Sequence, residues 1–195
     1  MLIGIMDNID KENNDKWRTF ICIDFPQKVL AEVTRVQEEV GKIKFQGKLT
    51  EVENLHLTLK FLGEIEEQKV NEVRKKLKDV KFKEMELRLG EAGLFSFHGN
   101  PRIVWIKVEG GKIWELQKEI DNKMNDLGFK KEERFMSHLT IARIKYVKNK
   151  EEFTGKIPKI GVKGIKFKLG KFKLMKSELK PIGPVYTIIE EYLSN

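Results

Sequence analysis

The amino-acid sequence repeats one pattern, and each copy of it ends in a His-x-Thr segment. In both copies an alternating stretch predicts a strand, an apolar stripe at helical spacing predicts a helix, and a second alternating stretch carries the His-x-Thr segment. The stretches are 18–25, 29–40 and 55–62 in the first copy and 103–108, 113–127 and 137–143 in the second. An internal duplication is the simplest account, so the chain is expected to form two similar lobes.

The segments outside the repeated pattern also have a regular periodicity. They predict a helix over about 66–79, a turn over 99–101, and strands over 82–89, 165–174 and 185–193, although the last of these also fits a helix. Helices and strands therefore occur in both halves, which indicates an α+β protein.

The two copies are not separated by a low-complexity linker. Residues 17–195 are therefore interpreted as a single α+β domain with two lobes, and residues 1–16, which show no periodicity, as an N-terminal extension. Lobes that share one domain leave a cleft between them, and such a cleft is a usual place for a binding or catalytic site.

Composition and net charge restrict the class of partner that the protein can bind, but they do not identify one partner. Hydrophobic residues make up 40% of the 195 residues and charged residues 35%, which predicts a soluble globular protein. No apolar run approaches the roughly 18 residues that a membrane span needs, so no membrane partner is expected. The net charge of +8 permits binding to a polyanion such as RNA, although the interspersed acidic residues also fit a solvated surface. The single Cys22 fits a reducing cytoplasm.

The two motifs place the same chemical groups on one face of each predicted strand. Side chains two residues apart on a strand point to the same side, so His56 projects with Thr58 and His138 projects with Thr140. The apolar residues between them point to the opposite, buried side. Each motif therefore offers one group that titrates near neutral pH and one hydroxyl donor on a rigid element.

Two such strands facing each other suit an in-line displacement at phosphorus. One imidazole removes a proton from the incoming oxygen while the other protonates the leaving oxygen. The hydroxyls donate to the non-bridging oxygens, and the scheme needs no metal and no cofactor. A zinc site is one competing interpretation, but two histidines without a clear set of Cys or acidic ligands beside them make a poor zinc site. Two structural histidines without catalytic use are a second, and the remaining His98 is expected in a solvated loop.

The sequence around the motifs resembles the two-histidine (2H) phosphoesterases, and more specifically the RNA 2',3'-cyclic phosphodiesterase group, also called 2'-5' RNA ligases. The resemblance rests on ENLHLTLKFLGE, RFMSHLTIAR and the opening RTFICIDFP, and it spans about residues 17–193. It implies a bilobal fold with pseudo-twofold symmetry, two antiparallel sheets with helices outside, and a central cleft lined by both motif strands. It also implies that His56 donates a proton and His138 accepts one. One departure is Ser137, where the family commonly has proline.

Three further side chains are predicted to bind the substrate. Arg143 stands where the family typically has arginine, but on an ideal strand it faces away from His138, so a phosphate contact requires a bulge or bend after Thr140. Lys60 shares the face of the first motif by alternation and is predicted to contact a neighbouring RNA phosphate. Phe135, just ahead of the second motif, is predicted to stack on a base.

These observations predict an enzyme that opens a terminal RNA 2',3'-cyclic phosphate to a 2'-phosphomonoester. We expect a cytoplasmic monomer whose partner is RNA, with tRNA halves as one candidate substrate. A 2'-5' RNA ligase acting on tRNA-half-like ends also fits, because the same groups serve the reverse reaction. An RNA- or nucleotide-binding module without turnover would keep the same fold. An enzyme for a cyclic phosphate on a small molecule, such as an ADP-ribose derivative, would use the same two histidines.

Overall fold

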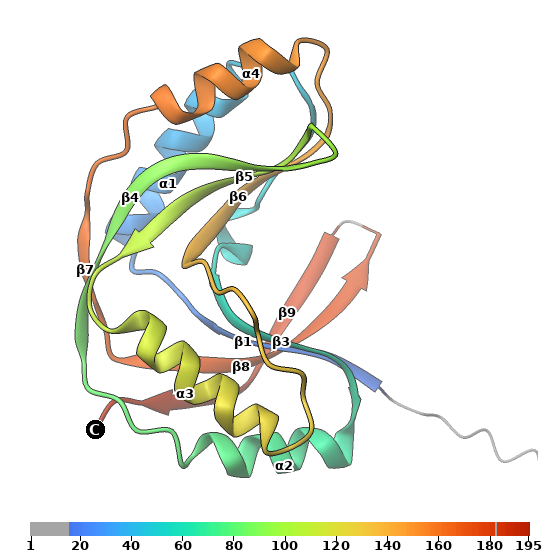
Figure 1. The fold of residues 1–195 in the computed structure, drawn as a ribbon, viewed down its shortest axis with the longest axis vertical. Coiled ribbons are helices and arrows are strands. Elements are labelled where there is room, and N and C mark those ends of the chain that lie inside the picture. Colours follow the sequence, from blue (N-terminus) through green and yellow to red (C-terminus); the bar gives the residue numbers. More distant parts are fainter. Residues whose placement is uncertain (1–15, 182) are drawn as a thin grey trace, which may run out of the picture.

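The computed structural model describes residues 16–181 and 183–195, and within them the chain forms two antiparallel sheets with helices on their outer faces (Figure 1). The predicted α+β class and two-sheet architecture are confirmed. The expected N-terminal extension lies outside the described residues except for Lys16, which begins the first strand.

The first-motif sheet has four strands in the order β3-β1-β8-β9, and all neighbours are antiparallel. The second-motif sheet has five strands in the order β2-β6-β5-β4-β7, also antiparallel. The strands of the first-motif sheet are β1 (Lys16–Ile23), β3 (Leu57–Glu66), β8 (Lys171–Lys180) and β9 (Gly183–Leu193). The strands of the second-motif sheet are β2 (Gln46–Leu49), β4 (Met85–Phe97), β5 (Asn100–Glu109), β6 (His138–Tyr146) and β7 (Lys166–Leu169).

A helix from each copy of the repeated pattern contacts a strand of the other copy. The helices are α1 (Gln27–Gly41), α2 (Glu67–Leu77), α3 (Ile113–Asn125) and α4 (Lys150–Lys156), with single 3₁₀ turns at Val52–Asn54 and Ile157–Lys159. The α1 helix, from the first copy, contacts β6, and α3, from the second copy, contacts β3 (Figure 1). Each motif strand is thus supported by a helix of the other copy, so the two lobes share a core. None of the described helices is long and apolar enough to cross a membrane.

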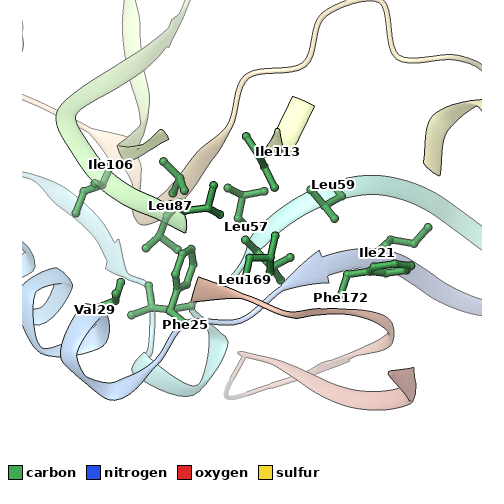
Figure 2. Packing of buried hydrophobic residues seen from close by; sticks show 14 of the residues in the cluster. Ile21, Phe25, Val29, Leu57, Leu59, Leu87, Ile106, Ile113, Leu169 and Phe172 are labelled. Atoms are coloured by element: carbon green, nitrogen blue, oxygen red, sulfur yellow. The ribbon is translucent and has the colours of Figure 1, made fainter. Parts of the chain in front are cut away.

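The core forms where the predicted apolar stripes meet. Val29, Val33, Val36 and Val40 are fully buried along one side of α1, at the spacing that predicted this helix. On the first-motif sheet, the alternate residues of β1 and β3 pack with Ile113 of α3 and Phe172 of β8 (Figure 2). The motif side chains lie on the opposite side of the same strands.

Several boundaries differ from the sequence predictions: β4 runs over Met85–Phe97 where 82–89 was expected, and the single strand expected over 165–174 is divided into β7 and β8. The turn between β4 and β5 consists of His98 and Gly99, with φ of 47° and 69°, and Asn100 already pairs with Phe97. A two-residue hairpin turn with positive φ at both positions matches the strand twist, and glycine adopts that conformation at little cost. The predicted turn at 99–101 was therefore one residue late. The last segment, which also fitted a helix, is the strand β9.

Each motif strand contains a bulge at the same distance from its histidine. In β3, Thr58 pairs with Cys22 and Lys60 with the next residue, Ile21, so one extra residue is inserted. In β6, the extra residue lies between Thr140 and Ala142. Both residues of each bulge are buried, and alternation resumes in the opposite phase after it.

Candidate active site

The two histidines occupy equivalent positions and are held in the same way. His56 directly precedes β3, and His138 is the first residue of β6. The Nδ1 atom of His56 lies 2.8 Å from the carbonyl oxygen of Asn54, and that of His138 lies 2.7 Å from the carbonyl oxygen of Met136. A carbonyl only accepts hydrogen bonds, so Nδ1 is the donor in both rings. Each Nε2 is therefore the atom that takes up or releases a proton.

Aromatic rings surround His56. The ring of Phe20 lies 4.8 Å from it at an interplanar angle of 32°, and the ring of Tyr186 lies 5.2 Å away at 88°. Burial lowers the pKa of His56 to about 4, although the Asn54 carbonyl favours the charged form, and the positive charge of Arg143 lowers this pKa further. His56 is consequently neutral in the free protein at pH 7.

Arg143 links the two motif strands electrostatically. It belongs to β6, yet its charge acts on His56 and on Tyr186, which belong to the first-motif side. The strands β3 and β6 are also in direct contact. The bulge after Thr140, which a phosphate contact requires, is present and returns Arg143 to the side of His138. The role of Arg143 in binding substrate stays a prediction.

His138 has a less aromatic environment than His56. The ring of Phe95 meets it edge-on at 5.1 Å and 86°, and Trp105 packs behind Phe95 at 5.5 Å. The Val108 amide donates to the Ser137 carbonyl at 3.1 Å, which fixes the chain just ahead of the motif. Ser137 therefore keeps the strand entry in register although it is not proline.

The two threonines lie half-buried on their strands, two residues after the histidines. Alternation places the Thr58 hydroxyl on the side of His56 and the Thr140 hydroxyl on the side of His138. Within residues 16–181 and 183–195, neither hydroxyl has a hydrogen-bond partner. Both are available to donate to a ligand bound beside the histidines.

Lys60 does not lie on the face of His56, and this prediction is wrong. The bulge in β3 turns Lys60 into the interior, where it is only 3% exposed. Its Nζ donates to Asp121 Oδ1 at 2.6 Å and to the carbonyl of Lys130, and the same carboxylate accepts from the Glu132 amide. The charge of Lys60 is therefore compensated within the protein by the Asp121 carboxylate.

The bulge instead brings Phe61 to the face predicted for Lys60. Phe61 is 59% exposed and its ring lies 6.1 Å from that of Phe20, which contacts His56. Sequence reasoning missed Phe61, although the same bulge that was required after the second motif would have revealed it in the first. Phe135, by contrast, is partly buried against the core, and its predicted stacking on a base stays untested.

A cavity of about 480 Å³ extends beside His56 over the first-motif sheet. Its apolar lining includes Phe20, Met175 and Tyr186. Cys22 also lines it, but burial raises the pKa of this thiol to about 12, so it stays protonated and is a poor nucleophile. Among the described residues, no three or more His, Cys, Asp and Glu side chains are grouped so that they could hold a metal ion.

Comparison with known proteins agrees with this geometry. The sequence model of the LigT-like phosphoesterases matches the chain twice, over residues 23–105 and 106–186. The chain belongs to the LigT-like phosphoesterase family. Two successive matches, each containing one His-x-Thr motif, also support the internal duplication of this LigT-like phosphoesterase.

Relatives of the LigT-like chain align over almost its whole length. The RNA 2',3'-cyclic phosphodiesterase of Methanocaldococcus jannaschii is 38% identical over 177 residues, which are 90% of this chain and 99% of the relative. The protein of the same name from Thermotoga maritima is 35% identical and covers 89% and 94% of the two chains.

Solved structures share the fold of this LigT-like chain. A Thermus thermophilus protein superposes with a TM-score of 0.78 at 27% identity, covering 90% of this chain and 97% of the other. Escherichia coli LigT complexed with 3'-AMP gives 0.74 at 20% identity, covering 92% and 99%. The resemblance inferred from the two motifs is confirmed.

Proposed function

We propose that this LigT-like phosphoesterase hydrolyses 2',3'-cyclic phosphates at RNA ends to 2'-phosphomonoesters by metal-independent catalysis with two histidines. The observation that supports the proposal is the pair of imidazoles, His56 and His138, at equivalent positions of the contacting strands β3 and β6, each with Nδ1 committed to a backbone carbonyl. The substrate class is supported by the names of the relatives, which cover 90% and 89% of the chain.

The proposed reaction uses the two Nε2 atoms as acid and base. His138 Nε2 accepts a proton from water as the water oxygen attacks phosphorus. The bond from phosphorus to the 3'-oxygen breaks, and that oxygen takes the proton of His56 Nε2. Thr58 and Thr140 donate to the non-bridging oxygens, where negative charge gathers in the transition state. A proton exchange with solvent then returns both rings to their starting state.

Because the pKa of His56 is low in the free protein, its Nε2 must take up a proton from solvent when the substrate binds. A bound phosphate places negative charge beside the imidazole, which favours the protonated form. A phosphate that pairs with Arg143 also compensates the guanidinium charge that lowers the pKa of His56. Substrate binding therefore converts a neutral His56 into the acid that the reaction needs.

Ligation would use the same displacement at this site with a different nucleophile. A 5'-hydroxyl in place of water gives a 2'-5' linkage with the proton transfers unchanged. The proposed partner is RNA, with tRNA halves as one substrate, and the proposed form is a cytoplasmic monomer. The net charge of +8 supports a polyanionic partner.

The test uses an RNA oligomer that ends in a 2',3'-cyclic phosphate and protein that has been dialysed exhaustively against EDTA. We expect hydrolysis at the rate seen before dialysis. Activity that is lost and then restored by zinc or manganese contradicts the two-imidazole scheme. Binding of the oligomer without turnover would indicate a binding module, and joining of an added 5'-hydroxyl RNA as the main reaction would indicate a ligase.

A further inference from the structure

Phe61 extends a row of aromatic rings outward from the active site. Its ring lies 6.1 Å from Phe20, and the ring of Phe20 lies 4.8 Å from His56 and 5.1 Å from Tyr186. Phe61 is the outermost member of this row and is 59% exposed. A single exposed apolar residue is ordinary, but one that continues an aromatic row from a catalytic histidine is in a position to contact substrate.

The position of Phe61 corresponds to that of Arg143 in the other motif. Each is the fifth residue after its histidine, and each directly follows the bulge in its strand. The duplicated backbone therefore aims both side chains at the cleft side of their sheets. One position carries a cation, which suits a phosphate, and the other carries a flat ring, which suits a base.

A groove of about 660 Å³ adjoins Phe61, and we call it the Phe61 groove. It is lined by residues 60–63 of β3 and by residues 129–134 of the segment that leads to the second motif. Lys130 forms an ion pair with Glu133 at 3.4 Å, which leaves Lys131 and Arg134 against the single carboxylate of Glu132 in the lining segment. The excess of positive charge fits a nucleic-acid backbone.

The Phe61 groove is preformed. Its outer segment is tied to β3 through Asp121, which accepts from Lys60 Nζ at 2.6 Å and from the Glu132 amide at 3.1 and 3.2 Å. Lys60 also donates to the carbonyl of Lys130. Lys60 and Asp121 are only 3% and 6% exposed, so water competes little for these contacts.

We infer that the Phe61 groove binds the penultimate nucleotide, the one before the nucleotide that carries the terminal cyclic phosphate. Its base stacks on Phe61, and the backbone on its 5' side follows Lys131 and Arg134. This assignment rests on the proposed function, because the cyclic phosphate must lie between the two histidines for the chain to leave past Phe61. It adds a substrate preference: an oligonucleotide end is used better than a single cyclic nucleotide.

The test compares three substrates: a nucleoside 2',3'-cyclic phosphate, a trinucleotide with the same end, and the trinucleotide with an abasic penultimate residue. Loss of one stacked base is worth about 5- to 150-fold in binding. Phe61→Ala should therefore lower kcat/KM on the intact trinucleotide by that factor. On the abasic trinucleotide, the kcat/KM values of Phe61→Ala and of the wild type should be nearly equal. Phe61→Trp should retain the preference for the intact trinucleotide.

Two controls separate stacking from other effects. Phe97→Ala removes an equally exposed ring, 65% exposed at the β4–β5 hairpin, and should leave all three rates unchanged. Binding of a fluorescent trinucleotide is measured in the His138→Ala background, where turnover does not interfere. There, Phe61→Ala should weaken binding of the intact trinucleotide more than that of the abasic one.

Two results would overturn the assignment: an equal loss on all three substrates, or no loss on the intact trinucleotide in either rate or binding. An inactive wild-type protein that still shows the Phe61-dependent binding would contradict the proposed function while supporting the groove.

Discussion

The two motifs share a backbone but differ in their surroundings. His56 and His138 each donate from Nδ1 to the carbonyl two residues before them, and each strand bulges after its threonine. His56, however, lies against two aromatic rings, whereas His138 meets the edge of Phe95. The duplication thus supplies the geometry twice, and the neighbouring side chains make the two sites unequal. An acid and a base built from the same residue type require such a difference.

The support of the two bulges differs as well. At the β6 bulge, Gln37 of α1 donates to the carbonyl of Ile141 at 2.8 Å. At the β3 bulge, the buried pair of Lys60 and Asp121 holds the segment before the second motif. The two copies are thus joined by a neutral hydrogen bond at the β6 bulge and by an ion pair at the β3 bulge. Of these two contacts, only the ion pair also holds a wall of the Phe61 groove.

The largest effect is expected from removing either histidine. His56→Ala and His138→Ala should each lower kcat by about 10²–10⁴-fold, which is the usual contribution of a positioned acid or base. The double variant should lose far less than the product of the two losses, because the pair acts as one unit. Single-turnover rates on the cyclic-phosphate oligomer measure this. His98→Ala at the hairpin turn is the matched control, and a loss there as large as in His56→Ala would refute the choice of histidines.

Breaking the buried ion pair should affect folding more than chemistry. Lys60→Met leaves the Asp121 carboxylate buried without its cation and should lower the free energy of unfolding by about 3–5 kcal/mol. Lys60→Met combined with Asp121→Leu should recover part of this loss, because no charge is left unpaired. Urea denaturation measures both variants. An unchanged stability together with a raised KM for RNA would instead support a contact between Lys60 and a phosphate of the substrate.

A smaller effect tests the cause of the low pKa of His56. Tyr186→Ala removes one of the two rings that bury the imidazole, so the pKa of His56 should rise from about 4 by roughly one unit. NMR titration of the imidazole protons reports it. Because the folded-state pKa lies below the unfolded value of about 6.5, the neutral ring stabilises the protein above pH 6.5, and this stability is lost as pH falls through about 4. Tyr186→Ala should weaken that dependence, and an unshifted pKa would contradict burial as the cause.

The parts of the molecule with a local signal could be predicted from the sequence. Val29, Val33 and Val36 predicted α1 through their spacing, and the two His-x-Thr segments predicted strands through alternation. The motif also has chemical meaning without any contact partner, since alternation alone places each threonine with its histidine. These features depend on residues close together in the chain.

The rest depends on contacts between distant residues. Alternation placed Lys60 in the cleft, but the bulge reverses the phase of the strand there and exposes Phe61 instead. Asp121, the partner of Lys60, lies on a helix of the other copy, so no local pattern points to it. Tyr186 likewise reaches His56 from the last strand of the sheet. The duplication contained one further signal that could have predicted the bulge in β3. A phosphate contact by Arg143 requires a bulge after Thr140, and the repeated pattern then predicts a corresponding bulge after Thr58.

The regiochemistry of the product tests the assignment of His56 as donor and His138 as acceptor most directly. If His56 faces the 3'-oxygen, only the bond to that oxygen is in line with the water held by His138. The RNA oligomer should then end in a 2'-phosphate with a free 3'-hydroxyl. Its phosphate should resist a 3'-specific phosphatase and be removed by a non-specific one. A predominantly 3'-phosphate product would contradict the account, because the substrate would then lie in the opposite orientation between the two histidines.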